Sequence, residues 1–185
     1  DWGNVAISKD GRLLAAVTQY VDTSMFVFDL WANPISGWQF TLYNPTTAQG
    51  TNNTGGVLYA DALSWDHCGE FLMYDAFNKL PNSSPGAADI EYWDVNFMRI
   101  WDQGSDQVGD GLVIKLFSNL PEGVSVGNAV FSKNSPYIIA YDEITADAVT
   151  VHAANIETGD LGPVWSNSAD VLGYPEWDHT DQFLT

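Results

Sequence analysis

Basic residues and cysteine are scarce in this chain of 185 residues. Only six lysines and arginines stand against 24 aspartates and glutamates, which gives a formal net charge of −18. Such a surface repels phosphate backbones and anionic lipid head groups, so we expect no nucleic-acid partner and no insertion into a membrane. The single cysteine, Cys68, excludes a disulfide bond within the chain.

Long apolar runs are absent as well. No stretch is long enough to span a bilayer. The chain begins at Asp1-Trp2-Gly3, without an initiator methionine and without an N-terminal signal segment. We therefore expect a processed or truncated chain.

The common catalytic motifs are missing too. The sequence has no Gly-x-Ser-x-Gly elbow, no glycine-rich phosphate loop with its lysine, and no His-Glu-x-x-His pair. We therefore expect no enzyme activity from this chain, although paired carboxylates from different parts of it stay open. Of the three histidines, His152 falls in an alternating segment and is predicted to be at the surface or at an edge.

What the sequence does have is a repeat of ten residues. The copies run Ile7–Ala16, Trp65–Tyr74 and Phe131–Ala140 without gaps, and a fourth copy, Trp177–Leu184, is cut short. Each copy has an apolar anchor, a Ser or Asp, a Lys or His, two turn residues, a polar residue and an apolar strand. The anchors lie 58, 66 and 46 residues apart, and each interval has room for four short strands.

The repeat predicts an all-β protein built of four-stranded antiparallel blades, with blade-like units at about 1–58, 59–124, 125–170 and an incomplete 171–185. In the second unit we expect a strand over Phe71–Ala76 and an insertion over Asn78–Asp89. A further strand is expected over Tyr92–Trp101, and the outer strand over Gly111–Phe117.

Several repeat positions invite a functional interpretation. The turn position after the Ser or Asp holds Lys9, His67, Lys133 and His179, and a position that accepts both residue types is predicted to be a solvated polar site. Glycine precedes three anchors, at Gly3, Gly127 and Gly173, where we expect the backbone to pass close to a neighbour. The aromatic anchors are predicted to pack between blades rather than to stack on a ligand.

Two acidic clusters are candidates for chemistry. Asp102, Asp106 and Asp110 recur every fourth residue among glycines, a weak pattern for a calcium loop that does not match the EF-hand spacing. Asp142, Glu143 and Asp147 form the second cluster, which we interpret as a polar loop between strands. No other cofactor is predicted.

The Ile7–Leu14 copy resembles the repeat of TolB-like β-propellers, which are similar to WD-repeat blades. The resemblance covers the four anchor regions and departs where Asp10-Gly11 becomes Cys68-Gly69 or Asn134-Ser135. It implies a propeller larger than the three blades and part of a fourth present here, or several chains that complete a ring. It also implies a periplasmic or extracellular protein.

Three functions follow as hypotheses. The first is a non-catalytic scaffold or binding module that takes a protein or a glycan through its loop faces, at 31–56, 78–94 and 103–123. The second, implied by the resemblance, is the propeller domain of a larger prolyl-oligopeptidase-type serine peptidase whose catalytic domain is absent here. The third is a structural subunit of an extracellular assembly, in which further blades or subunits associate with this chain.

Overall fold

The computed structural model describes residues 1–45, 56–82, 84–168, 170–182 and 184–185. Residues 46–55 of the predicted loop face over 31–56 lie outside this range, as does residue 183 of the fourth repeat copy. Fourteen strands form within it: β1 Trp2–Ile7, β2 Leu13–Thr18, β3 Ser24–Asp29, β4 Ser36–Thr41, β5 Val57–Trp65, β6 Phe71–Leu80, β7 Ile90–Arg99, β8 Trp101–Asp102, β9 Gln107–Val108, β10 Val113–Lys115, β11 Ser125–Phe131, β12 Ile138–Ile144, β13 Ala148–Asn155 and β14 Asp160–Ser168. In the described residues we find no helix that could span a membrane.

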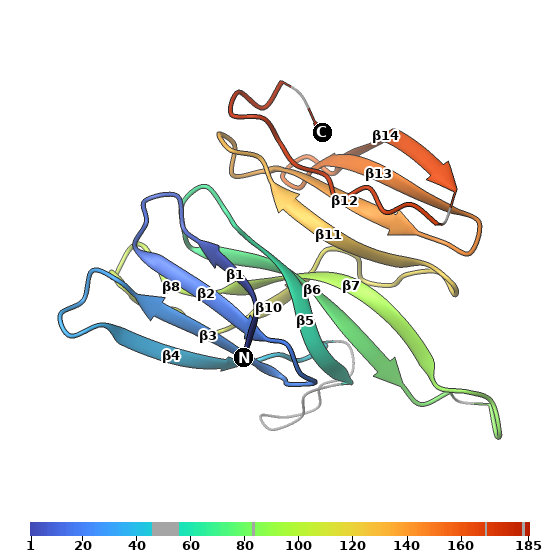
Figure 1. Ribbon diagram of the computed structural model, residues 1–185, viewed down its shortest axis with the longest axis horizontal. Coiled ribbons are helices and arrows are strands. Elements are labelled where there is room, and N and C mark those ends of the chain that lie inside the picture. The colour runs from blue at the N-terminus through green and yellow to red at the C-terminus, as the bar shows by residue number, and fades with distance from the viewer. Residues whose placement is uncertain (46–55, 83, 169, 183) are drawn as a thin grey trace.

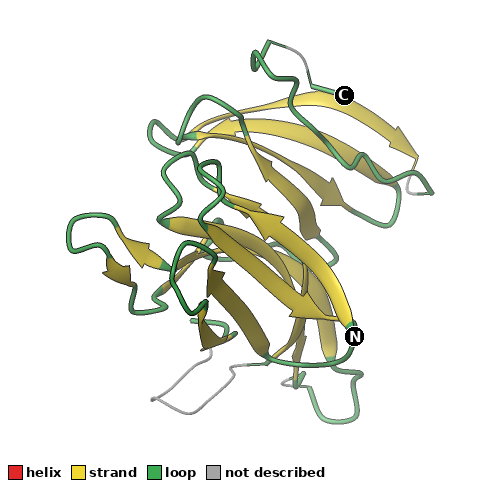
Figure 2. Cartoon of the chain, turned by 60° about the vertical axis from the view of Figure 1, so that its left-hand side comes forward, coloured by secondary structure: helices red, strands yellow, loops and turns green. Residues whose placement is uncertain are grey.

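The strands form three antiparallel four-stranded sheets and one small hairpin. The orders are β1-β2-β3-β4, β5-β6-β7-β10 and β11-β12-β13-β14, with β8 and β9 paired on their own. We call the three large sheets the first, second and third sheet. They follow one another along the chain, and their first strands β1, β5 and β11 lie side by side (Figures 1 and 2). This propeller-like arrangement confirms the prediction of an all-β protein with four-stranded antiparallel sheets.

Local sequence explains the strand order within a sheet. The run over Leu13–Thr18 is apolar and buried on both of its faces, as expected of an interior strand. The next strand, Ser24–Asp29, alternates half-buried and buried residues. The outermost strand, Ser36–Thr41, alternates exposed and half-buried residues, because one of its edges faces solvent.

Apolar side chains fill the spaces between the sheets. The core between the first and second sheets is the larger, and it includes Leu13, Val27, Trp65, Tyr74, Met98 and Trp101. The core between the second and third sheets is smaller, and it includes Met73, Phe97, Phe131, Ile139 and Tyr141. The sheets are therefore joined face to face through cores of unequal size.

Repeat anchors occupy equivalent positions at the ends of the first strands. Trp65 donates its indole N–H to the carbonyl of Ala6 at 3.1 Å, which links the second sheet to the first. Phe131 is 3% exposed and donates its backbone N–H to the hydroxyl of Ser64 at 3.0 Å. Ile7 is 55% exposed, because no described sheet packs on that face of β1. These contacts confirm that the aromatic anchors at 65 and 131 pack between sheets.

The gapless repeat was wrong in the third copy. In each turn the N–H of the residue after the anchor bonds to the carbonyl of the residue that opens the return strand: Ser8 to Leu13, Asp66 to Phe71, and Ser132 to Ile138. The third turn is therefore one residue longer. Strand pairing agrees, because the three anchors face Leu14, Leu72 and Ile139. In the return strand of the third copy, each residue is therefore one position later than the gapless alignment placed it: Ile139, and not Ile138, is equivalent to Leu14.

Three predicted boundaries in the second unit also change. The strand β6 continues to Leu80, so the predicted insertion from Asn78 shrinks to residues 81–89. The strand β7 ends at Arg99, and Trp101 begins the separate β8–β9 hairpin. The outer strand is the short Val113–Lys115. Hairpin pairing extends β6 and β7 beyond the apolar segments that the sequence marked, because backbone hydrogen bonds form irrespective of side-chain type.

Candidate functional site

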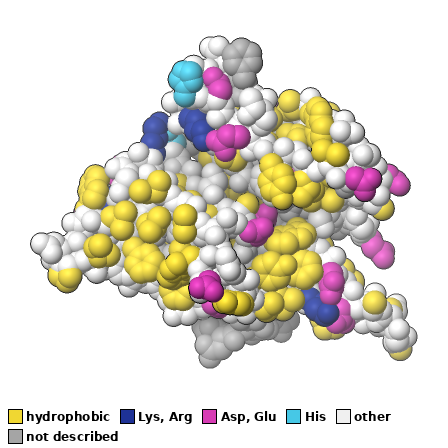
Figure 3. All heavy atoms as spheres, in the orientation of Figure 1, with side chains coloured by type: hydrophobic (Ala, Val, Ile, Leu, Met, Phe, Trp, Pro, Cys, Tyr) yellow, Lys and Arg dark blue, Asp and Glu magenta, His cyan; other side chains and the backbone are white. Residues whose placement is uncertain are grey.

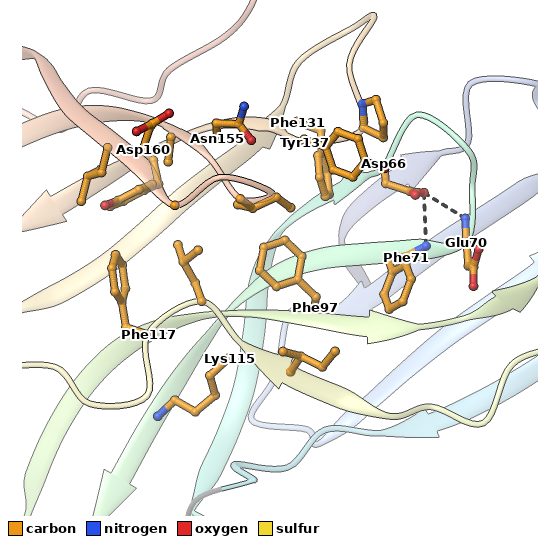
Figure 4. Close-up of a pocket in the computed structure, with 18 of the residues that line it drawn as sticks. Asp66, Glu70, Phe71, Phe97, Lys115, Phe117, Phe131, Tyr137, Asn155 and Asp160 are labelled. Carbon is orange, nitrogen blue, oxygen red and sulfur yellow. Dashed lines mark hydrogen bonds between the residues drawn. The ribbon is translucent and has the colours of Figure 1, made fainter.

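A groove of about 660 Å³ opens between the second and third sheets (Figure 4). Its wall is aromatic, formed by Phe71, Phe97, Phe117, Phe131, Tyr137 and Tyr141. The volume falls in the range of about 300–1,000 Å³ that is typical of ligand pockets, which are likewise apolar inside with a few polar groups. We call this feature the interblade groove.

Both sheets contribute to its wall. Phe71 and Phe97 lie on neighbouring strands of the second sheet, and Phe131 reaches across from the end of β11. The rings of Phe97 and Phe131 have centroids 5.9 Å apart, and those of Phe117 and Tyr141 are 5.7 Å apart. These ring pairs hold the wall in shape, because tilted and edge-on aromatic contacts at such distances are attractive.

The groove exists because one connection is short. In the second sheet, the connection between the third and fourth strands is residues 100–112, and it carries the β8–β9 hairpin. Its Trp101 packs on Trp38 of the first sheet, with centroids 5.8 Å apart, and fills the space between those sheets. In the third sheet the same connection is only residues 156–159. Four residues supply no side chain of comparable reach, so the corresponding space stays open.

The mouth of the groove is polar and mainly acidic. Asp66, Glu70, Asn155 and Asp160 lie around it, with Tyr137 44% exposed. The carboxylate of Asp66 accepts hydrogen bonds from the backbone N–H groups of Glu70, at 2.9 Å, and Phe71, at 3.1 Å (Figure 4). Burial nevertheless raises the pKa of Asp66 above its usual value. This rim favours a ligand that is neutral or positively charged.

Lys115, which also lines the groove, directs its ammonium group toward Asp94. The ammonium group of Lys115 lies 2.6 Å from Asp94 Oδ2, and both side chains are buried. Figure 4 shows the Lys115 side chain pointing away from the labelled phenylalanines. Burial raises the pKa of Asp94, an effect that the nearby ammonium group partly offsets. The groove interior therefore gains no free positive charge from this residue.

Cys68 lies at the mouth of the groove and is exposed. Burial of its thiol, followed by the negative charges of Asp66 and Glu70, raises the pKa of Cys68. The thiol form is thus favoured at neutral pH, which lowers its nucleophilicity.

The groove as a whole offers apolar and aromatic contacts inside and hydrogen-bond acceptors at its mouth, which is an arrangement for binding.

The calcium candidates have separate partners. Asp102 accepts the backbone N–H of Gly104 at 2.9 Å. Asp106 forms an ion pair with Arg12 at 2.6 Å, and Asp110 forms one with Arg99, also at 2.6 Å. Over the residues that the structure describes, no group of three or more His, Cys, Asp or Glu side chains is arranged to hold a metal ion.

The interpretation of the second acidic cluster as a loop was wrong for two of its members. Asp142 and Glu143 belong to the strand β12, and only Asp147 lies in the turn that follows. Asp142 is fully buried and accepts the backbone N–H groups of Gly173, at 3.0 Å, and Tyr174, at 3.2 Å. Its role is to tie the C-terminal segment to the third sheet.

His152 was also misplaced at the surface. Its side chain is only 13% exposed, and its ring stacks on that of Tyr141 with centroids 5.4 Å apart. Glu143 Oε2 lies 3.8 Å from His152 Nε2. The cross-strand pair of Tyr141 with His152 explains this, because both side chains leave the same face of the sheet.

Most groove residues were missed by sequence reasoning. Of the three predicted functional loops, only the one over 103–123 contributes, through residues 114–117. The other lining residues come from strands and turns that we interpreted as framework. A usable signal was present: the turn at 156–159 is short, whereas the equivalent connection in the second unit has thirteen residues, 100–112.

Comparisons with known proteins support the fold alone. No family model matches the chain. No curated protein sequence matches it either. Among solved structures, the chain is similar to Kuenenia stuttgartiensis hydrazine synthase, with a TM-score of 0.51 and 16% identity over 97% of this chain and 47% of that one. Two candidate 6-phosphogluconolactonases, from Bacteroides uniformis and Bacteroides fragilis, show TM-scores of 0.43 and 12% identity over 97% and 96% of this chain and 61% of theirs. The chain thus spans about half to three fifths of their lengths.

Proposed function

We propose that the protein is a non-catalytic binding module of a TolB-like propeller, secreted or in the cell envelope, and part of a larger ring. Its partner is a protein that inserts an apolar side chain into the interblade groove. The observation that supports this most directly is the aromatic wall of the groove, which stays open where the space between the first and second sheets is filled.

Charge and wall chemistry favour a basic peptide segment over a glycan. Glu70 and Asp160 line the mouth, and the whole chain carries a charge of −18. A lysine or arginine next to the inserted side chain would meet these carboxylates. A glycan needs many polar partners, whereas the interior is lined mainly by phenylalanine, isoleucine and leucine side chains.

The test uses two fluorescent pentapeptides, Lys-Leu-Phe-Leu-Lys and Glu-Leu-Phe-Leu-Glu, titrated with the protein and followed by anisotropy. We expect saturable binding of the basic peptide and binding at least about tenfold weaker for the acidic one. The variant Ala154→Phe should weaken binding of the basic peptide, because its ring fills part of the groove. Tyr20→Ala is the matched control, because this exposed residue lies outside the groove.

Equal binding of the two peptides, or full binding by Ala154→Phe, would contradict the proposal. A parallel array of neutral and acidic oligosaccharides distinguishes the glycan alternative. The lone Cys68 at the mouth offers a second route, because its thiolate can attack a small aromatic disulfide, which leaves a mixed disulfide on Cys68 and releases one aromatic thiol. Capture should be reduced in Ala154→Phe and unchanged in Tyr20→Ala.

A further inference from the structure

The repeat position that alternates between lysine and histidine gathers its side chains at one end of the first strands. The turns that carry Lys9, His67 and Lys133 follow β1, β5 and β11, and they lie in a row in Figure 1. Beneath them is a cavity of about 330 Å³, lined by these three residues and by Glu176. We call this group the turn cluster.

Lys9 lies at the centre of the turn cluster. Its ammonium nitrogen is 3.0 Å from His67 Nδ1 and 2.8 Å from the carbonyl oxygen of Lys133. An ammonium group only donates hydrogen bonds, so His67 Nδ1 must be the acceptor and carries no proton. In the neutral ring the proton therefore sits on Nε2.

Lys9 is also exceptional in its charge environment. The other five basic side chains each pair with at least one carboxylate: Arg12 with Asp29 and Asp106, Lys79 with Asp89 and Glu91, Arg99 with Asp110, Lys115 with Asp94, and Lys133 with Glu176. Among the described residues, Lys9 has no carboxylate within ion-pair distance. In a chain with 24 acidic residues, this positive charge is available to a ligand. Figure 3 shows basic and histidine side chains, with acidic side chains among them, at the upper edge of the molecule.

The third turn shows what such a turn binds. The carboxylate of Asp181 accepts the backbone N–H groups of Lys133, at 2.6 Å, and Asn134, at 2.7 Å. Asp181 comes from the fourth repeat copy and has a left-handed backbone, with φ of 59°. The protein thus already places a carboxylate on the backbone of one repeat turn.

The first turn is one residue shorter, but it also places two backbone N–H groups directly after its serine, and it lacks that carboxylate. The residue equivalent to Asp181 is Gly69 of the second copy, also left-handed with φ of 73°. A Cβ on Gly69 would lie 3.5 Å from Ser8 Cβ, so this residue does border the first turn. The N–H groups of Lys9 and Asp10 make no hydrogen bond to any described residue.

We propose that the first turn binds a carboxylate group of a ligand. The backbone N–H groups of Lys9 and Asp10 hold its oxygens, as those of Lys133 and Asn134 hold Asp181. The Lys9 ammonium group supplies the charge. Hydrogen bonds from a charged donor are the strongest that a protein offers a carboxylate. Here the two backbone N–H groups would donate to the same carboxylate as the Lys9 ammonium group. The ligand is the terminal or side-chain carboxylate of a peptide.

The test is an NMR titration of the labelled protein with three probes. N-acetylglycine ends in a carboxylate, the α-amide of N-acetylaspartic acid carries one only on its side chain, and N-acetylglycinamide carries none. We expect saturable shifts of the Lys9 and Asp10 amide signals with one or both acids. The acid that binds more tightly shows whether the site prefers a terminal or a side-chain carboxylate. Shifts of equal size with the neutral amide, or no saturable shift with either acid, would overturn the proposal.

Two variants and a control sharpen the result. Lys9→Gln should weaken acid binding about tenfold, because one charge-assisted hydrogen bond is lost. Gly69→Asp should abolish binding, because its carboxylate would take the place that Asp181 takes at the third turn. Lys79→Gln, on a distant exposed hairpin, should bind like the wild type. Unchanged affinity in Lys9→Gln, with a 15N spectrum showing that His67 has lost its Nδ1 contact, would refute the assignment.

Discussion

The carboxylate of Asp75 on the second sheet accepts a hydrogen bond of 3.0 Å from the backbone N–H of Asn128 on the third sheet. Its other oxygen accepts the N–H groups of Asp61, at 3.2 Å, and Ala62, at 2.7 Å. Asp142 is the equivalent residue one sheet further on. A buried carboxylate on the second strand thus links each of these two sheets to the segment that follows it.

The stability of the protein should depend on pH through Asp75. Burial raises its pKa from 3.8 to about 6. The folded protein therefore binds this proton more tightly than the unfolded chain, so the free energy of unfolding falls as pH rises from about 4 to about 6. The decrease is on the order of 3 kcal/mol, from 1.36 kcal/mol for each pKa unit. Asp75→Asn, which resembles the protonated acid, should remove it.

Urea unfolding at several pH values between 4 and 7 measures this effect. At each pH, the free energy of unfolding of Asp75→Asn is subtracted from that of the wild type, and the difference isolates the contribution of the carboxylate. If the free energy of unfolding has the same dependence on pH in both proteins, protonation of Asp75 is not the cause of the decrease.

Gly173 should tolerate no side chain. A Cβ at this position would overlap with Asp142 Oδ1 and Val151 Cγ2. We expect Gly173→Ala to lower the free energy of unfolding by about 1–3 kcal/mol, the usual cost of overpacking. Gly162→Ala is the control, because nothing lies within 4 Å of its Cβ. Thermal unfolding of both variants measures the difference, and equal melting temperatures would contradict the close approach.

Equivalent repeat anchors should differ in their importance. Phe131 is 3% exposed, whereas Ile7 is 55% exposed. We expect Phe131→Ala to cost about 3–5 kcal/mol, because it leaves a cavity between two sheets, and Ile7→Ala to change stability by about 0.5 kcal/mol or less. Chemical denaturation of the two variants compares the same repeat position in two environments. A large loss for Ile7→Ala would mean that its exposed face is covered in solution.

Arg12 should hold the β8–β9 hairpin against the first sheet. Its guanidinium group pairs with Asp29 at 3.0 Å and with Asp106 at 2.6 Å, and it lies 4.3 Å from the centre of the Trp101 ring. The hydrogen bonds from Arg12 also lower the pKa of Asp29. This stabilisation is therefore present above the ordinary pKa of Asp29 and is lost as pH falls through the lowered value.

Replacing Arg12 by lysine removes the planar fork and keeps the charge. We expect Arg12→Lys to cost about 1–2 kcal/mol and to alter the fluorescence of Trp101. Lys79→Arg, at an exposed ion pair, is the control and should change neither property. Wild-type stability in Arg12→Lys would show that charge alone suffices.

Much of the fold was readable from the repeat. The alternation of turn and apolar strand after Ile7, Trp65 and Phe131 predicted the all-β class and the four-stranded sheets. The extra residue in the third turn was not readable, because Asn134, Ser135 and Pro136 are all acceptable turn residues and only strand pairing shows where the turn ends. The burial of Asp142 was hidden for a similar reason: its partners, Gly173 and Tyr174, lie about thirty residues away.

The sequence by itself determined the class of the protein, its charge and the position of its repeat turns, because these depend on composition and on local backbone preferences. Only the tertiary structure decided where a groove opens between the sheets and which turn residues contact one another. The interblade groove depends on the length of one connection relative to another in a different sheet. The contact between Lys9 and His67 joins residues 58 positions apart. Such properties arise from how the sheets pack, and no local pattern encodes them.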